Sequence, residues 1–430
     1  MPAFIVNQTE RLSGQAKIPS SKSHTLRAIL FAALADGESC IKNVLNSPDT
    51  IAMIKACQQL GAKIKQTGST LLVQGIAGKP CIPDNVIDAG NSGLVLRFVG
   101  AIAGLIDGAT VITGDQSVRH NRPAKPLLDG LNQLGAKAFS TRGDDKAPIV
   151  IQGPIQAGKL RIDGQDSQPV SGLLIASQFL TGRTEIFVDN PGEKPWLNLT
   201  LAWFKRLSLQ AEHSPDFSHF MIKGSAKLKA FDYCVPSDFS SLAFPVAAAL
   251  LTHSEITLQG VDMNDSQGDK ALLEALSKMG AIFDYSDSAK TLTVHRCESL
   301  RGTTLDINDY IDSITILAVI GCYAQGKTVI KNAAIARQKE CDRIASIATE
   351  LKKMGANIEE TDDGLTIKRS TLHGAQVYSH HDHRVAMSLA VAGLIAEGKT
   401  DIENINCVKK TFPNFIEVMK SLGANIEVCE

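Results

Sequence analysis

Met354-Gly-Ala-Asn-Ile358 is one of six similar segments spread along this 430-residue sequence. The other five are Leu60-Gly-Ala-Lys-Ile64, Leu134-Gly-Ala-Lys-Ala138, Leu207-Ser-Leu-Gln-Ala211, Met279-Gly-Ala-Ile-Phe283 and Leu422-Gly-Ala-Asn-Ile426. Their second residues are 68 to 75 residues apart, about one sixth of the chain. The regular spacing predicts six structural repeats.

Each segment follows an amphipathic stretch and precedes an alternating one. In Ile344–Met354 the apolar residues recur at helical spacing, and Gly355 supplies the left-handed residue that ends a helix. Gly364-Leu-Thr-Ile-Lys368 then alternates as a strand does. The sequence therefore predicts a surface helix, a glycine stop and a strand in each repeat.

A second element of turn plus strand recurs about six times, as in Gly326-Lys-Thr-Val-Ile-Lys331 and Gly398-Lys-Thr-Asp-Ile-Glu403. Helices rich in small apolar residues precede it, for example Arg27–Ala35 and Leu242–Leu251, and their weak polar faces favour burial. We therefore expect an α/β (α+β) fold of two bodies with three repeats each, the helices inside, the sheets outside and a cleft between the bodies.

Composition excludes several classes of protein. The 44 Lys and Arg balance 45 Asp and Glu, so the net charge gives no reason to expect nucleic acid or an anionic membrane as partner. The apolar run Val385–Ala396 is too short to span a bilayer, and the start of the chain lacks the pattern of a secretory signal. Nine scattered cysteines without a CxxC pair fit a reducing compartment, so we expect a cytoplasmic protein.

Gly321-Cys-Tyr-Ala-Gln-Gly-Lys-Thr328 matches the P-loop pattern, but its context is wrong. A P-loop follows a strand and opens a helix, whereas this segment is expected to end a helix and open a strand. We interpret it as a turn of the repeat.

Chemically unusual residues gather where the buried helices are expected to start. In Pro19-Ser-Ser-Lys-Ser-His-Thr-Leu-Arg27, Ser23 and Arg27 share a helix face, and Lys22 lies at the positive end of the helix dipole. This pattern favours a phosphate-type anion site, the alternative being a serine cap followed by a solvated arginine.

The next helix start contains Gly90, Gly93 and Arg97, with backbone N–H groups that a ligand can approach closely. The polar loop Gly114–Pro123 adds Arg119 and Arg122, which bind an anion or are simply solvated.

Lys339-Glu-Cys-Asp-Arg343 puts two cations four residues apart at a helix start, with Glu340 and Asp342 between them as possible proton carriers. The alternative is an ordinary salt-bridged helix face.

In His380-His-Asp-His-Arg384, a helix cap by Asp382 beside an anion-binding Arg384 is favoured over a metal site, because no further ligands have suitable spacing. Asp312 opens the fifth buried helix as a cap or as a base.

Taken together, these residues resemble the enolpyruvyl transferase family over essentially the whole chain. The matching motifs are Ser21-Lys-Ser23 with Arg27, Gly90-Asn-Ser-Gly93 with Arg97, Arg122-Pro123, Ser167-Gln168, Lys194-Pro195, Gln267-Gly-Asp269, Lys339–Arg343, Asp382-His-Arg384 and Lys410-Thr-Phe-Pro413. The resemblance implies two domains of three βαβαββ units each, one formed by residues 1–19 plus 233–430 and the other by residues 20–232.

The resemblance also implies an activity: the enolpyruvyl group of phosphoenolpyruvate passes to the 5-hydroxyl of shikimate 3-phosphate, and phosphate is released without a cofactor or metal. Implied catalytic residues are Asp312, Glu340 and Lys22. Implied ligands of shikimate 3-phosphate are Lys22, Ser23, Arg27, Ser167, Gln168, Asp312 and Lys339. Implied ligands of phosphoenolpyruvate are Lys22, Gly93, Arg122, Gln168, Arg343, Arg384 and Lys410. We expect a monomer with these small molecules as its partners.

Two alternatives remain open. A relative that acts on UDP-N-acetylglucosamine typically has Lys-Asn near its start and a cysteine in the Gly114–Pro123 loop, which this chain lacks. A non-catalytic anion-binding relative is the other, because Leu94, Asp166 and Ile335 depart from the commoner family residues. Asp166 would repel a nearby phosphate unless it turns away or pairs with a cation.

Overall fold

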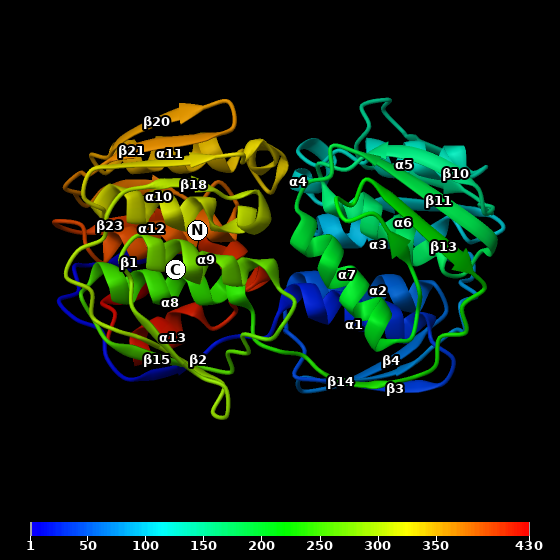
Figure 1. The fold of residues 1–430 in the computed structure, drawn as a ribbon, viewed down its shortest axis with the longest axis horizontal. Helices are drawn as coiled ribbons and strands as arrows, with labels where there is room; N and C mark the ends of the chain where they lie inside the picture. Colours follow the sequence, from blue (N-terminus) through cyan, green and yellow to red (C-terminus); the bar gives the residue numbers. More distant parts are fainter. Residues whose placement is uncertain (1, 430) are drawn as a thin grey trace. The chain divides into compact units, whose positions relative to one another are not determined.

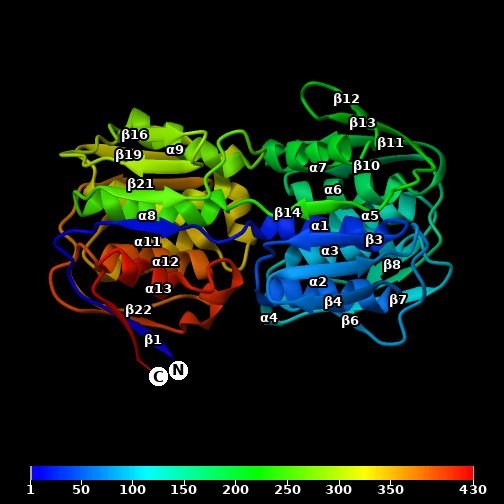
Figure 2. The ribbon, with the colours of Figure 1, turned by 90° about the horizontal axis from the view of Figure 1, so that it is seen from below.

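The computed structural model describes residues 2–429, which form two compact units. Unit 2 is Ser20–Val235, and unit 1 comprises the described residues before and after that segment. The chain therefore leaves unit 1 after Pro19 and returns at Pro236, three residues later than the expected boundary at 232/233. The short strand β14 (Asp232–Cys234) causes this difference, because it pairs in parallel with β3 (Glu38–Lys42) inside unit 2 (Figure 2).

The elements of both units follow the chain order seen in Figure 1. The remaining elements of unit 2 are α1 (Lys22–Leu34), α2 (Pro48–Gln59), β4 (Lys63–Thr67), β5 (Thr70–Gln74), β6 (Ile87–Asp88), α3 (Gly93–Ala103), β7 (Ala109–Thr113), α4 (Gln116–His120), α5 (Lys125–Gln133), β8 (Lys137–Ser140), β9 (Ile149–Gln152), β10 (Lys159–Asp163), α6 (Ser167–Ser177), β11 (Thr181–Asp189), α7 (Lys194–Arg206), β12 (Glu212–His213) and β13 (His219–Gly224).

Unit 1 contains the strands of both chain ends. Its elements are β1 (Ala3–Val6), β2 (Gln15–Lys17), α8 (Phe239–Leu251), β15 (Ile256–Gln259), η1 (Gly268–Lys270), α9 (Ala271–Lys278), β16 (Phe283–Ser286), β17 (Thr291–Val294), β18 (Thr304–Asp306), η2 (Asn308–Ser313), α10 (Ile314–Tyr323), β19 (Lys327–Lys331), η3 (Ala334–Gln338), α11 (Arg343–Lys353), β20 (Asn357–Thr361), β21 (Gly364–Lys368), β22 (Gln376–Tyr378), α12 (His383–Gly393), β23 (Thr400–Glu403), η4 (Ile405–Lys410), α13 (Phe415–Ser421) and β24 (Ile426–Cys429).

The described residues form six four-stranded sheets, three in each unit. Every sheet contains one parallel pair and two antiparallel pairs, as in β18-β19-β21-β20. The run β18-α10-β19-α11-β20-β21 is one complete repeat, so the expected repeat is confirmed. Three repeats take a strand from elsewhere in the sequence: β14 joins the sheet of β3, β2 joins the sheet of β15, and β1 pairs with both β23 and β24.

The helix stops predicted from the sequence are confirmed. The second residue of each repeated segment has a positive φ, including 92° at Gly355 and 57° at Ser208, the one copy without glycine. After α10, the chain turns at Gly326 into β19. The P-loop-like segment is therefore a turn between a helix and a strand.

The helices rich in small residues are buried, as expected. Every residue of α3, α8 and α12 is buried. In unit 1, α8, α10 and α12 pack against one another, and α11 buries Ile344, Ile347 and Leu351 while it exposes Lys352 and Lys353. The interior helices therefore carry their starts, with the candidate residues, on a rigid core.

Candidate active site

The start of α1 presents a lysine beside a buried carboxylate. The Ser21 side chain caps the helix by accepting a hydrogen bond from the backbone N–H of His24 at 3.4 Å. Lys22 is the first helical residue, 17% exposed, with its Nζ 3.9 Å from Oδ2 of the buried Asp49. This position puts the ammonium group at the positive end of the α1 dipole, which favours an anion.

Arg27, one turn further along α1, is a buried cation with neutral partners. Its Nε and Nη2 donate to the Thr200 hydroxyl at 3.2 and 3.1 Å, and its guanidinium lies 5.1 Å from the centre of the Phe98 ring. No carboxylate of residues 2–429 pairs with it. Burial lowers the pKa of Arg27 to about 9, because the charge is removed from water without an opposite charge beside it. An anionic ligand would supply the opposite charge that Arg27 lacks among the described residues.

The start of α3 brings two guanidinium groups against a glycine. A Cβ on Gly93 would lie 2.6 Å from Nη1 of Arg97, and it would also overlap Nη1 of Arg122. Arg122 is buried, whereas Arg119 of the same loop is exposed. Of the two loop arginines, Arg122 is therefore the one that packs at the helix start.

The start of α6 is linked to α3 through Arg97. Nη1 of Arg97 donates to Oε1 of Gln168 at 3.2 Å, and Nη2 lies 2.9 Å from Oδ2 of Asp166. Oδ1 of Asp166 accepts the Gln168 backbone N–H at 3.0 Å and so caps α6. Asp166 thus pairs with a cation, which removes the main electrostatic objection to a phosphate nearby.

In unit 1, Arg343 is surrounded by three carboxylates. Its Nε donates to Asp382 at 2.7 Å, its Nη1 to Asp312 at 2.7 Å and its Nη2 to Glu340 at 2.6 Å. Burial alone would lower the pKa of Arg343, but the charges of Asp382, Glu340 and Asp312 outweigh burial and hold the pKa well above its ordinary value. The guanidinium therefore fixes both expected proton carriers, Asp312 and Glu340, at one point.

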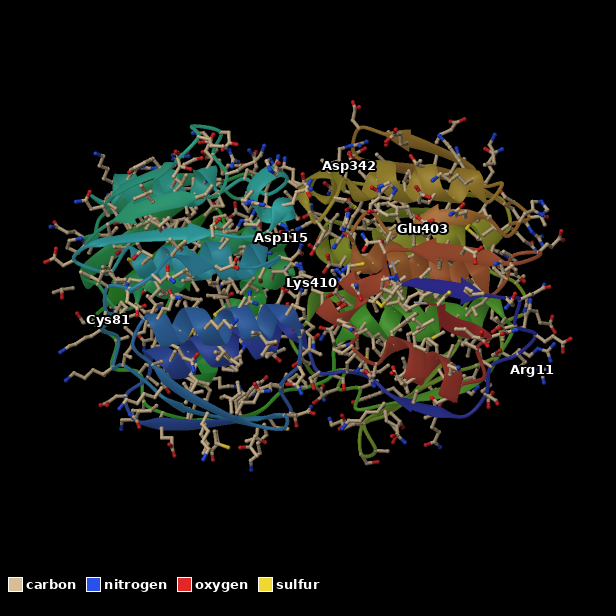
Figure 3. All side chains as sticks on the ribbon, turned by 180° about the vertical axis from the view of Figure 1, so that it is seen from behind. Arg11, Cys81, Asp115, Asp342, Glu403 and Lys410 are labelled. Atoms are coloured by element: carbon tan, nitrogen blue, oxygen red, sulfur yellow. The ribbon has the colours of Figure 1, made fainter. Side chains whose placement is uncertain are left out.

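Two more cations join this cluster. Nη2 of Arg384 donates to Oδ2 of Asp312 at 2.6 Å and to the Ser240 hydroxyl at 2.9 Å, and Nζ of Lys410 (Figure 3) donates to Oε1 of Glu340 at 2.7 Å. The Nε of Arg384 is buried and has no hydrogen-bond partner among the described residues. An anion bound here could accept a hydrogen bond from Nε of Arg384. It would also compete with Asp312 and Glu340 for the cations that these carboxylates bind.

Three sequence-based interpretations are settled in unit 1. Asp382 caps α12, as expected, through the backbone N–H groups of Arg384 and Val385. The interpretation of Asp312 as a cap is wrong: it lies in η2, and its carboxylate bridges Arg343 and Arg384. The helical spacing expected for Lys339 and Arg343 is also wrong, because Asp342 caps α11 and Lys339 lies before the helix.

Residues 2–429 lack the features of a metal site and of a membrane-spanning helix. No group of three or more His, Cys, Asp or Glu side chains there is arranged to hold a metal ion. None of the helices described there is long and apolar enough to cross a bilayer.

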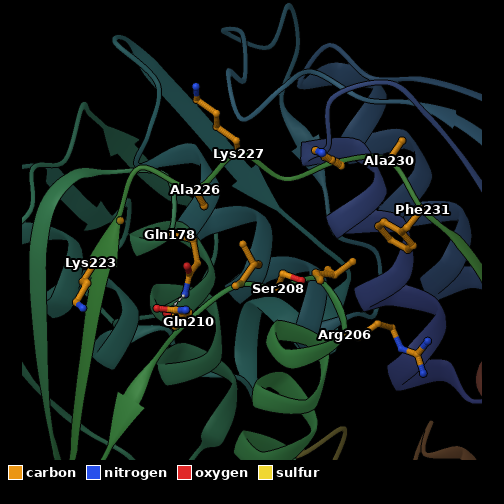
Figure 4. Close-up of a pocket in the computed structure, with 13 residues that line it drawn as sticks. Gln178, Arg206, Ser208, Gln210, Lys223, Ala226, Lys227, Ala230 and Phe231 are labelled. Carbon is orange, nitrogen blue, oxygen red and sulfur yellow. Dashed lines mark hydrogen bonds between the residues drawn. The ribbon is translucent and has the colours of Figure 1, made fainter.

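A separate hollow of about 520 Å³ lies at the C-terminal end of α7 in unit 2 (Figure 4). Its lining includes Arg206, Lys223 and Lys227, but none of the expected site residues. Figure 4 shows these three side chains pointing in different directions, while Gln178 in the centre donates to the Gln210 carbonyl at 3.1 Å. The cations do not converge on one point, so this hollow is not a candidate for the active site.

Comparison with known proteins identifies the family. The model of the EPSP synthase (3-phosphoshikimate 1-carboxyvinyltransferase) family matches residues 6–419. The chain belongs to the EPSP synthase family. A 3-phosphoshikimate 1-carboxyvinyltransferase of Acetivibrio thermocellus is 42% identical over 420 residues, which cover 98% of each chain. One of Methanocaldococcus jannaschii is 42% identical over 435 residues, which cover 100% of each.

A solved structure has the same fold. An EPSP synthase from Acinetobacter baumannii matches all of both chains with a TM-score of 0.83 at 26% identity. The enolpyruvyl transferase resemblance drawn from the motifs is therefore confirmed at the level of the family, and so is the fold class.

Sequence reasoning missed several contacts within this EPSP synthase fold. Asp382 was expected to be a cap, but it is also a partner of Arg343, and only its apolar neighbours on a buried helix hinted at a second role. Thr200 on α7 joins Arg27 to the Ser171 hydroxyl on α6, and nothing in the sequence marked it. Glu193, buried beside Ser167, was missed for the same reason.

Proposed function

We propose that this chain is an enzyme that transfers the enolpyruvyl group of phosphoenolpyruvate to the 5-hydroxyl of shikimate 3-phosphate and releases phosphate. The observation that supports this best is the cluster of Arg343, Arg384 and Lys410 around Asp312 and Glu340. In this cluster, cations suited to an anionic substrate are hydrogen-bonded to the two expected proton carriers. The family and the names of the relatives support the same reaction.

In this proposal the helix starts of unit 2 hold shikimate 3-phosphate. The unsatisfied charge of Arg27 and the ammonium group of Lys22 favour an anion at the start of α1. Ser167 and Gln168 offer a hydroxyl and an amide at the start of α6. Ser23 lies beside Lys22, and Asp312 and Lys339 are the contributions expected from unit 1.

Phosphoenolpyruvate is assigned to the other cations. In unit 1 these are Arg343, Arg384 and Lys410, and in unit 2 they are Arg122 beside Gly93, together with Lys22 and Gln168. Each positive group offsets part of the repulsion between two polyanionic substrates, and holding the reacting atoms close together replaces a rare encounter in water.

The proposed chemistry is addition followed by elimination. The Asp312 carboxylate takes the proton of the 5-hydroxyl while the oxygen of that hydroxyl bonds to C2 of phosphoenolpyruvate. Glu340 or Lys22 gives a proton to the methylene carbon C3. The resulting tetrahedral intermediate then loses a proton from C3, the C2–C3 double bond re-forms, and the C2–O bond to phosphate breaks. We infer that the enzyme is a cytoplasmic monomer, since none of the nine cysteines, all within residues 2–429, is placed in a disulfide and one chain supplies every candidate residue.

A comparison of acceptors tests this proposal. The protein is incubated with phosphoenolpyruvate and, separately, shikimate 3-phosphate, shikimate or UDP-N-acetylglucosamine, and the products are identified by mass spectrometry. We expect an enolpyruvyl adduct and an equal amount of phosphate with shikimate 3-phosphate. An adduct with UDP-N-acetylglucosamine alone would favour the rival transferase, and no adduct with any acceptor would favour the non-catalytic relative.

A further inference from the structure

The start of α6, where the proposed function puts the substrate phosphate, is already held by carboxylates of the chain. The backbone N–H and the hydroxyl of Ser167 both donate to Oε2 of Glu193, each at 3.2 Å. The backbone N–H of Gln168 donates to Asp166. The first N–H groups of a helix have no acceptor within the helix and attract anions, so these carboxylates take the role of a bound anion.

The two carboxylates are not equivalent. Asp166 is the cap of α6 itself and is paired with Arg97 at 2.9 Å. Glu193 comes from a different element, the residue before α7, and is 2% exposed. A phosphate that approaches Ser167 would therefore compete with Glu193 for the same N–H and hydroxyl donors, whereas Asp166 accepts from a different N–H group.

The backbone conformation at Glu193 fixes the position from which its side chain extends. Its φ of 47° and ψ of 41° are left-handed, a conformation that is unfavourable for a residue with a side chain. The preceding Gly192 packs so closely on the segment before α6 that a Cβ would lie 2.7 Å from the carbonyl oxygen of Gln165. A strained, tightly packed backbone thus presents the carboxylate to Ser167. Because this backbone is fixed, the carboxylate can leave Ser167 only by rotation of the Glu193 side chain.

We propose that Glu193 is a placeholder for the substrate phosphate: its carboxylate accepts the N–H and hydroxyl hydrogen bonds of Ser167 and leaves when the phosphate arrives. This inference rests on the proposed function, because it assumes that the phosphate binds at Ser167. The placeholder lowers the affinity for shikimate 3-phosphate and also selects for it. Shikimate itself carries no phosphate that could displace the carboxylate from the same donors.

The Glu193→Gln variant tests the placeholder. The amide keeps the size of the side chain and an oxygen that accepts from Ser167, but it removes the charge that competes with phosphate. We expect the KM for shikimate 3-phosphate to fall about threefold to tenfold, the range that corresponds to the net contribution of one ordinary hydrogen bond. The kcat and the KM for phosphoenolpyruvate should stay within about a factor of two, since they do not involve this competition.

Two further variants frame the result. Glu212→Gln, which removes a 65% exposed carboxylate of unit 2, should leave every constant unchanged. Glu193→Asp keeps the charge on a side chain one methylene shorter, so the KM should fall less than in Glu193→Gln. An unchanged KM in Glu193→Gln would overturn the proposal, and a raised KM would show that Glu193 instead positions Ser167 for the substrate.

Calorimetric titration with inorganic phosphate separates this inference from the proposed function. If the unaltered protein makes no enolpyruvyl adduct, the proposed function fails, but tighter phosphate binding by Glu193→Gln would still support the placeholder. If the unaltered protein is active and neither phosphate affinity nor KM changes in Glu193→Gln, the placeholder fails and the function stands. If Glu193→Gln does not fold, the phosphate affinity of Glu193→Asp, measured by the same titration, tests the placeholder instead.

Discussion

Arg27 and Arg343 are both almost fully buried, yet their surroundings differ in charge. Arg27 has only neutral partners, so its burial destabilises the fold. Replacement by methionine, which has a similar length and no charge, should therefore increase the free energy of unfolding by about 1 to 3 kcal/mol. The same change should raise the KM for shikimate 3-phosphate roughly a hundredfold, because it removes a buried charge that is proposed to bind this substrate.

Urea unfolding and steady-state kinetics of Arg27→Met measure both effects. Greater stability together with weaker substrate binding is the signature of a residue kept for function. A loss of stability would show that the neutral contacts of Arg27 hold the fold instead.

Arg343→Met should have the opposite effect on stability. Three carboxylates would lose their shared cation, so the free energy of unfolding should fall by about 3 to 5 kcal/mol. Urea unfolding of this variant beside Arg27→Met compares two buried arginines in one chain. Equal shifts of the same sign would contradict the electrostatic difference described above.

Gly93→Ala should weaken phosphoenolpyruvate binding. The added methyl group would collide with the guanidinium groups of Arg97 and Arg122, and we expect the KM for phosphoenolpyruvate to rise about tenfold, as for other overpacked sites. Gly158→Ala is a matched control, since its Cβ would have an ordinary contact of 3.7 Å. If both variants leave this KM unchanged, the arginines at Gly93 do not position the ligand.

At the scale of helices and strands, much of the fold could be predicted from the sequence. The glycine stops and small-residue helices follow local rules, and they gave the repeat correctly. The contacts of the candidate site are different, because they join residues that are distant in the sequence. Arg343 is 31 residues from Asp312 and 39 residues from Asp382 along the chain. Such pairings depend on how repeats pack, which no local pattern encodes. The boundary error at β14 has the same origin, since a three-residue strand is recognisable only beside β3.

The helix caps of α11 and α12 provide a prediction at this scale. Asp342 caps α11 and pairs with the partly exposed Arg337, so Asp342→Ala should cost about 1 kcal/mol, as for a typical cap. Asp382→Ala removes a cap and also the buried partner of Arg343, so it should cost about 3 to 5 kcal/mol. Urea unfolding followed by circular dichroism gives both values, and equal costs would mean that the Asp382–Arg343 pair adds nothing.

For the whole molecule, the important fact is that the cations are divided between the two units. Lys22, Arg27 and Arg122 belong to unit 2, whereas Arg343, Arg384 and Lys410 belong to unit 1. We expect both substrates together to draw the two units closer, because each substrate is proposed to take donors from both units. Small-angle scattering should then show a smaller radius of gyration with both ligands in the unaltered protein, but not in Arg27→Met. The same radius with and without both ligands would count against this closure.

Release of inorganic phosphate from shikimate 3-phosphate and phosphoenolpyruvate tests the central claim most directly. Lys22 and Asp312 are placed by different elements, one as a cation at a helix start and one as a proton acceptor between two arginines. We predict phosphate release by the unaltered protein, only when both substrates are present, and a loss of at least about a hundredfold in Lys22→Met and Asp312→Ala. Unchanged release in both variants, or none from the unaltered protein, would contradict the account.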